Sequence, residues 1–221
     1  MTEIKSRLDE NGYVFIPAYV PQLETIISIK GLGNILEIED IDQKQILVPK
    51  HLPKLTPNTY SGNYGLSTFP LHTDLAHWLI PPRYFALRCI VGAVAVATHL
   101  IDTKDIILAI GRNELRRALV QPRRAINGSR GIYRLLETLA NQKELFRWDS
   151  LFIQPINEYS RSVIDDVTSF LNVEAKTEIH LINQGDTLIL DNWRMLHGRA
   201  SVNSSSINRR IERVYLEEVF H

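Results

Sequence analysis

Two blocks of strand-like sequence enclose a helical stretch, and this order limits the folds open to the chain. Apolar runs bounded by Gly, Pro, Asn or Asp predict strands at residues 84–90, 94–101, 178–182, 187–190 and 210–219. Apolar residues at steps of three and four predict helices at 105–119, 131–140 and 159–171. Strict strand–helix alternation, the mark of a doubly wound parallel sheet, is absent. The pattern therefore predicts an α+β, mainly β fold, a sandwich or barrel with a helical insertion between its two halves.

The N-terminal third supplies smaller elements. Residues 6–20 predict a short helix, a turn at Asn11-Gly12 and a strand, and residues 21–29 predict a second helix. Residues 53–70 are rich in Pro, Thr, Asn, Ser and Gly with interleaved aromatics, and they predict a loop that leads directly into His72.

Composition limits the function classes. A chain of 221 residues with 44% apolar content is expected to form one domain, residues 1–221. Twenty-five basic and 25 acidic side chains cancel, so no long-range field favours nucleic acid or a membrane surface, and a small molecule is the expected partner. The single Cys89 and a charged N-terminus without a secretory pattern lead us to expect a cytoplasmic protein. A homo-oligomer is left open.

His72 and Asp74 stand two positions apart in the stretch PLHTDLAHW. In an extended segment, residues i and i+2 point to the same face, so both side chains could hold one ion while Thr73 faces away. A mononuclear Fe(II) site of the oxygenase kind needs a second histidine and leaves three positions open. The best candidate is His197 in GDTLILDNWRMLHGR, 125 positions downstream.

Three segments resemble a known family: PLHTD, PPRYFALRC and GDTLILDNWRMLHGR. They look like those of the iron(II)- and 2-oxoglutarate-dependent dioxygenases of the taurine dioxygenase and clavaminate synthase-like (TauD/TfdA) superfamily. The resemblance implies a double-stranded β-helix, a cupin-like jelly roll, with His72, Asp74 and His197 as iron ligands. It also implies that 2-oxoglutarate and O2 are consumed while a substrate C–H bond is oxidised. An intact Asp74 favours hydroxylation, desaturation or cyclisation over halogenation.

The resemblance also assigns residues to cosubstrate and substrate. It matches the family's R-x-x-x-R pair to Arg209 and Arg213 in NRRIERVYLEE, where Arg209 would hold the distal carboxylate of 2-oxoglutarate. Arg213 would meet an acidic group of the substrate, which suggests an amino acid or another carboxylate-bearing metabolite. Thr98 is matched to a cosubstrate-binding threonine, although Val96 and Ala97 precede it where the family commonly has two glycines.

The substrate pocket is expected near the loop before the metal motif and just after it. Its expected polar and aromatic contacts are Asn63, Tyr64, Ser67, His77 and Trp78. Two other function classes stay open at this point. One is a cupin-type metal-dependent isomerase or lyase without cosubstrate, and the other is a non-catalytic jelly roll that binds a ligand.

Overall fold

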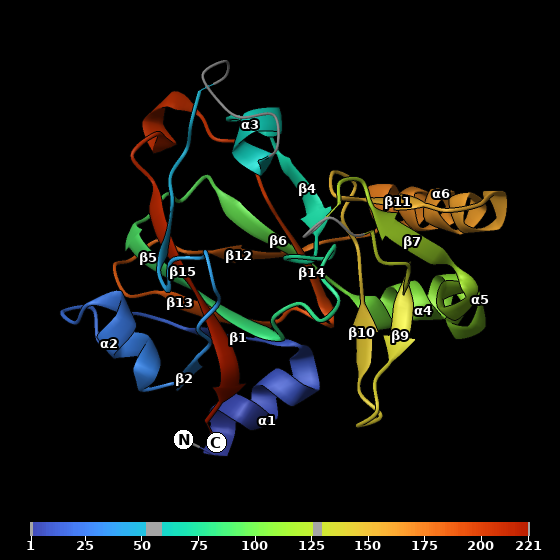
Figure 1. The fold of residues 1–221 in the computed structure, drawn as a ribbon. Helices are drawn as coiled ribbons and strands as arrows, with labels where there is room; N and C mark the ends of the chain where they lie inside the picture. Colours follow the sequence, from blue (N-terminus) through green and yellow to red (C-terminus); the bar gives the residue numbers. More distant parts are fainter. Residues whose placement is uncertain (1, 52–58, 126–129, 221) are drawn as a thin grey trace.

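Two antiparallel β-sheets face each other, and a helical lobe stands beside them (Figure 1). The computed structural model describes residues 2–51, 59–125 and 130–220. The larger sheet has the strand order β1-β13-β5-β15-β2, with β3 also paired to β15, and the smaller sheet has the order β12-β6-β14-β4. The predicted mainly β jelly roll with flanking helices and an insertion is therefore confirmed.

The strands of the larger sheet are β1 (Tyr13–Ile16), β2 (Gly33–Ile35), β3 (Gln45–Leu47), β5 (Tyr84–Val91), β13 (Thr187–Asp191) and β15 (Arg210–Val219). Those of the smaller sheet are β4 (Phe69–His72), β6 (Ala97–Asp102), β12 (Thr177–His180) and β14 (Met195–Arg199). Helices α1 (Thr2–Asn11) and α2 (Thr25–Lys30) lie against the larger sheet, and α3 (Tyr60–Tyr64) precedes β4.

The lobe between β6 and β12 contains α4 (Thr103–Ile110), α5 (Arg112–Arg117) and α6 (Glu158–Val173). Its described residues also form five short strands: β7 (Leu119–Pro122), β8 (Tyr133–Arg134), β9 (Leu136–Thr138), β10 (Glu144–Phe146) and β11 (Ile153–Pro155). Within the described residues, no helix is both long and apolar enough to cross a membrane.

Alternation of side chains along β15 explains how one strand serves two environments. Val214 and Leu216 face outward and pack with the residues under α1 and α2, whereas Ile211 and Tyr215 face the space between the sheets. Because successive side chains of a strand point to opposite faces, Arg213 shares the inner face with Ile211 and Tyr215. The same rule places Phe85 and Leu87 of β5 inside and Ala86 outside.

Two helix predictions need correction. Residues 131–140 form β8 and β9 rather than a helix, because β7 and β10 provide strand partners and tertiary pairing overrides a short apolar pattern. The predicted helix 105–119 is two helices. Gly111, with φ +99°, separates α4 from α5, since a right-handed helix does not accommodate that conformation.

The predicted loop 53–70 also differs in part. Its described portion contains α3, which Thr59 caps by accepting from the Gly62 amide, and the start of β4. Residues 53–58 of that prediction lie outside the described residues. Cys89 is buried between the sheets, as expected for a packing residue.

Gly198 lets β14 approach β4 closely. A Cβ atom at this position would lie 2.7 Å from the carbonyl oxygen of Phe69. We expect Gly198→Ala to lower the free energy of unfolding by about 1–3 kcal/mol, because the clash is with backbone that must shift. Chemical denaturation measures this loss, and an unchanged unfolding free energy would contradict the expected strain.

Candidate metal centre and active site

His72 and His197 are cross-strand partners in the smaller sheet. β4 and β14 are antiparallel neighbours, and the two histidines lie directly opposite each other in the register. Opposite residues of neighbouring strands point to the same face, so both imidazoles enter the space between the sheets. Their ring centroids are 4.3 Å apart.

Asp74 completes the group from the turn after β4. One potential ligand atom of each of His72, Asp74 and His197 lies within 4.8 Å of the others, and all three residues are buried. The Nε2 atoms of both histidines are 3.6 Å from Oδ1 of Asp74, which is longer than a hydrogen bond. The three donor atoms thus point toward one position and are not hydrogen-bonded to each other, which is the arrangement that a bound cation requires.

The tautomer of His72 fits metal binding. Its Nδ1 lies 2.9 Å from the Pro70 carbonyl oxygen, which can only accept, so Nδ1 carries the proton. The Nε2 lone pair is then free to face the centre, an arrangement typical of metal-ligating histidines. Nδ1 of His197 is buried without a hydrogen-bond partner among the described residues. Two imidazoles and one carboxylate are the donor set of a mononuclear non-haem Fe(II) site.

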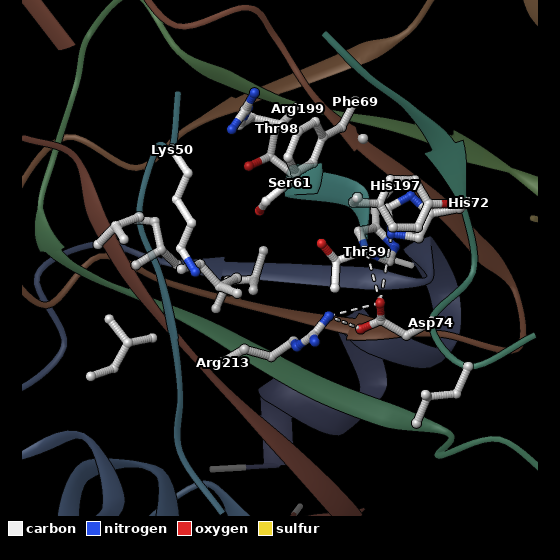
Figure 2. Close-up of a pocket in the computed structure, with 18 of the residues that line it drawn as sticks. Lys50, Thr59, Ser61, Phe69, His72, Asp74, Thr98, His197, Arg199 and Arg213 are labelled. Carbon is white, nitrogen blue, oxygen red and sulfur yellow. Dashed lines mark hydrogen bonds and ion pairs between the residues drawn. The ribbon is translucent and has the colours of Figure 1, made fainter. Parts of the chain in front are cut away.

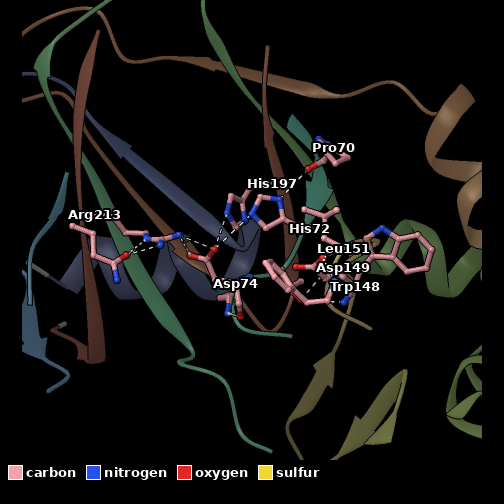
Figure 3. Close-up of polar contacts among 12 residues, drawn as sticks. Pro70, His72, Asp74, Trp148, Asp149, Leu151, His197 and Arg213 are labelled. Atoms are coloured by element: carbon pink, nitrogen blue, oxygen red, sulfur yellow. Dashed lines mark hydrogen bonds and ion pairs between the residues drawn. The ribbon is translucent and has the colours of Figure 1, made fainter. Parts of the chain in front are cut away.

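Arg213 neutralises Asp74 (Figure 3). Its Nη1 donates to both carboxylate oxygens, at 2.8 Å to Oδ1 and 2.6 Å to Oδ2, and the Tyr215 hydroxyl donates to Oδ2 at 3.2 Å. Burial alone would raise the pKa of Asp74, but the charge of Arg213 and the neighbouring His197 hold this pKa well below its usual range. The carboxylate is therefore ionised and ready to bind a cation.

Gln45 fixes Arg213 from the other side. Gln45 and Arg213 lie opposite each other in the β3–β15 register, and the Gln45 side-chain oxygen accepts from Nε of Arg213 at 2.8 Å and also from Nη2. All three guanidinium nitrogens are thus engaged between an amide and a carboxylate. Each side-chain nitrogen of Arg213 therefore already donates to a described residue. Contact between Arg213 and the substrate remains a prediction.

The turn carrying Thr73 and Asp74 is held by two distant segments. The Asn192 side chain accepts from the Asp74 amide at 2.7 Å and donates to the Asp74 and Pro82 carbonyls. The Thr73 amide donates to the Trp148 carbonyl at 2.7 Å, while the Thr73 hydroxyl accepts from the Trp148 amide at 3.1 Å. Thr73 faces away from the centre, as expected, and anchors the insertion lobe to the metal turn.

A cavity of about 450 Å³ opens beside this centre (Figure 2). It brings together seven of the residues singled out from the sequence: His72, Asp74, His77, Thr98, His197, Arg209 and Arg213. The other four are not among its lining residues. Asn63, Tyr64 and Ser67 lie in or just after α3, and Trp78 lines a separate surface hollow. Substrate contact by these four stays a prediction.

Arg209 has no carboxylate partner among the described residues. Its side chain is 7% exposed, it lines the cavity, and its Nε has no hydrogen-bond partner. Burial lowers the pKa of Arg209 to about 10, which still leaves it protonated at neutral pH. The acidic residue nearby in sequence, Glu212, instead accepts from Thr25 and Arg210. Arg209 is thus a buried cation with room in front of it for an anionic ligand.

The sequence did not single out several cavity residues. Asp149 is 3% exposed, accepts from the Leu151 and Phe152 amides, and burial raises the pKa of its carboxyl group. Tyr60 stacks on His72 with ring centroids 4.1 Å apart. Lys50 follows β3 and also lines the cavity. Asp149 begins a turn after β10, so its sequence signal is that of an ordinary turn residue.

Comparisons with solved structures find the same fold. An asparagine oxygenase, solved with Fe(II), 3-hydroxyasparagine and succinate, aligns with TM-score 0.70 and 13% identity over 97% of this chain and 78% of that one. PvcB from Pseudomonas aeruginosa aligns with TM-score 0.69 and 17% identity over 97% of this chain and 79% of that one. The non-haem iron oxygenase OrfP, solved with Fe and L-canavanine, aligns with TM-score 0.62 and 15% identity over 97% of this chain and 78% of that one.

The chain has the fold of these oxygenases. No protein-family model and no curated sequence matches it. The structural likeness therefore extends far beyond what sequence identity reveals, and the function must be argued from the cavity.

The strap, which we define as residues 45–50, is expected to support the metal through Gln45. Replacing Gln45 with Leu removes the acceptor that fixes Arg213, so Arg213 and Asp74 gain freedom. We expect affinity for Co(II), measured by calorimetric titration, to fall several-fold, below the roughly 10–100-fold typical of direct outer-shell partners. Gln43→Leu is the matched control, because the Gln43 side chain bonds the exposed Glu37 and, in the described part of the chain, no residue of the metal centre. Equal affinity of both variants would disprove this support.

His197 is expected to make the metal-free protein sensitive to acid. Burial, followed by the neighbouring His72, lowers the pKa of His197 to about 4, whereas the unfolded value is near 6.5. Below pH 6.5 the His197 imidazole is protonated in the unfolded chain but not in the folded one. Stability is therefore lost as pH falls from 6.5 to about 4. Across that range we expect the wild type to lose about 3 kcal/mol more than His197→Gln. Urea unfolding at several pH values measures the difference, and parallel curves would contradict it.

Proposed function

We propose that this protein is a non-haem Fe(II) oxygenase. It couples oxidative decarboxylation of 2-oxoglutarate to oxidation of a C–H bond in a small molecule, an amino acid or another carboxylate-bearing metabolite. The outcome is hydroxylation, desaturation or cyclisation. The observation that carries the proposal is the convergence of His72, Asp74 and His197 beside Arg209 in one cavity. The three solved relatives, each an oxygenase of this fold, support it.

The metal would be held by the two Nε2 atoms and by Oδ1 of Asp74. Iron(II) in such a site supplies open positions for cosubstrate and O2 and the redox chemistry of the reaction. Arg213 donates to both carboxylate oxygens and Tyr215 donates to Oδ2, so these two residues would hold Asp74 in place beside the metal. An intact carboxylate in this position argues against halide as the third ligand.

The cosubstrate would lie between the metal and Arg209. The guanidinium of Arg209 offers a planar pair of donors that matches a carboxylate, and no described acid competes for it. Thr98 lines the same cavity and supplies a hydroxyl for the same ligand. Leu87 and Ile211 from β5 and β15 exclude water beside these polar groups. A cupin-type isomerase or lyase would have no use for Arg209.

The proposed iron and cosubstrate sites are tested together by spectroscopy and turnover. Anaerobic addition of Fe(II) and 2-oxoglutarate should give a weak visible charge-transfer band, and His72→Ala should abolish it because one of three ligands is lost. Arg209→Ala should weaken 2-oxoglutarate binding by at least tenfold, since a charge-assisted pair is removed. Arg210→Ala is the matched control, because Arg210 pairs with Glu212 outside the cavity.

The result also separates the function classes. A wild-type protein that binds metal but gives no band and no succinate would contradict the oxygenase and favour the isomerase or lyase. A protein that binds the metal and 2-oxoglutarate but forms no succinate with any substrate would favour the non-catalytic ligand-binding jelly roll.

A further inference from the structure

The cavity has an excess of positive charge. Among the described residues that line it, Lys50, Arg199, Arg209 and Arg213 are cationic, whereas Asp74 and Asp149 are acidic. Four cations against two carboxylates leave a formal net charge of +2. A divalent metal and the dianion 2-oxoglutarate would cancel each other. The loaded cavity would therefore still carry this excess, and low-dielectric walls strengthen its attraction for an anion.

Two of the four cations have partners within the protein. Arg213 is committed to Asp74 and Gln45, as described above. Arg199 donates to the Gly65 carbonyl at 2.9 Å and to the Ser67 carbonyl at 2.6 Å, and its guanidinium lies 3.7 Å from the centre of the Phe69 ring. These contacts use Arg199 to hold the segment after α3 against β14.

Arg199, Arg209 and Lys50 have no acid partner among the described residues, and Arg209 and Lys50 also lack the backbone carbonyl acceptors that Arg199 has. Arg209 is enclosed and suits the cosubstrate. Lys50 is exposed at the end of the strap, and Figure 2 shows its side chain reaching along the cavity on the side opposite His72. Lys44, which precedes the strap, differs: its ammonium pairs with Glu24 and Glu212. The strap thus presents to the cavity one ammonium that no acid among the described residues pairs with.

We propose that Lys50 binds a carboxylate of the substrate at the cavity mouth and that the substrate is selected as an anion. This inference rests on the proposed oxygenase function, since Arg209 is reserved for the cosubstrate. A lysine ammonium is a compact point charge on a flexible stem, so it accepts carboxylates in several orientations. The substrate would extend from Lys50 toward the side of the metal centre formed by His72 and Asp74. A cavity of about 450 Å³ admits only a small molecule beside 2-oxoglutarate.

The test uses binding without turnover. Protein loaded with Zn(II) and 2-oxoglutarate is titrated calorimetrically with the protein amino acids and with dicarboxylic acids of three to six carbons. Each acid that binds is compared with amides of the same skeleton in which each carboxylate is replaced in turn, such as L-aspartate with L-asparagine and with its α-amide. We expect at least one acid to bind about tenfold more tightly than one of its amides, because a charge-assisted contact is lost in that amide.

Variants at position 50 then assign that preference. Lys50→Gln should remove the acid preference and Lys50→Arg should keep it, while the dissociation constant for 2-oxoglutarate stays unchanged in both. Lys44→Gln, the same substitution at a lysine that does not line the cavity, should keep the preference. The proposal is overturned if no acid in the panel binds, if amides bind as well as acids, or if Lys50→Gln binds acids as tightly as the wild type.

The outcome is separable from that of the proposed function. Loss of 2-oxoglutarate binding in wild-type protein would overturn the oxygenase before any acid is added. Weaker 2-oxoglutarate binding in Lys50→Gln, with an unchanged acid preference, would instead place Lys50 in the cosubstrate site and overturn the assignment made here.

Discussion

The buried ion pair between Asp74 and Arg213 is the interaction on which the rest of the site depends. A carboxylate that is 5% exposed and lies between two imidazoles would be costly to keep ionised without a cation beside it. Arg213 supplies that charge, and breaking such a buried pair from one side typically costs about 3–5 kcal/mol. Gln45 holds the Arg213 end of the pair, and Tyr215 and Asn192 hold the Asp74 end.

The alternation of side chains along the strands of the sandwich places the Arg213 side chain in the space between the sheets, where the metal centre lies. Arg213 belongs to the inner face of β15 because Ile211 and Tyr215 do, and His72 and His197 share an inner face because they are register partners. The period of two along a strand therefore determines which residues meet. The spacing of His72 and Asp74 predicted a joint role only together with the His197 segment, and Asp74 reaches the centre from the turn after β4 rather than from an extended strand.

The D-N-x-R-x-x-H-G-R segment shows what the sequence could not provide. Its residues carried the resemblance, but their contacts are made only after folding: Asp191 pairs with Arg83, Asn192 clamps the Asp74 turn, and Arg194 pairs with Asp102. None of these partners lies within 80 positions, so no local pattern identifies them. The same limit explains the error at residues 131–140, where strand partners from β7 and β10 outweigh a local helical pattern.

Charge state is the property that spacing predicts least well. Arg209 and Arg213 are four residues apart and line the same cavity, yet among the described residues an acid lies within reach of Arg213 and not of Arg209. Burial lowers the pKa of Arg209, while the Asp74 carboxylate offsets burial and raises the pKa of Arg213. Two identical side chains of one motif thus differ in what they can bind. An anion that enters the cavity can therefore pair with Arg209 but not with Arg213, which Asp74 already holds. A second anion would be bound by Lys50 of the strap.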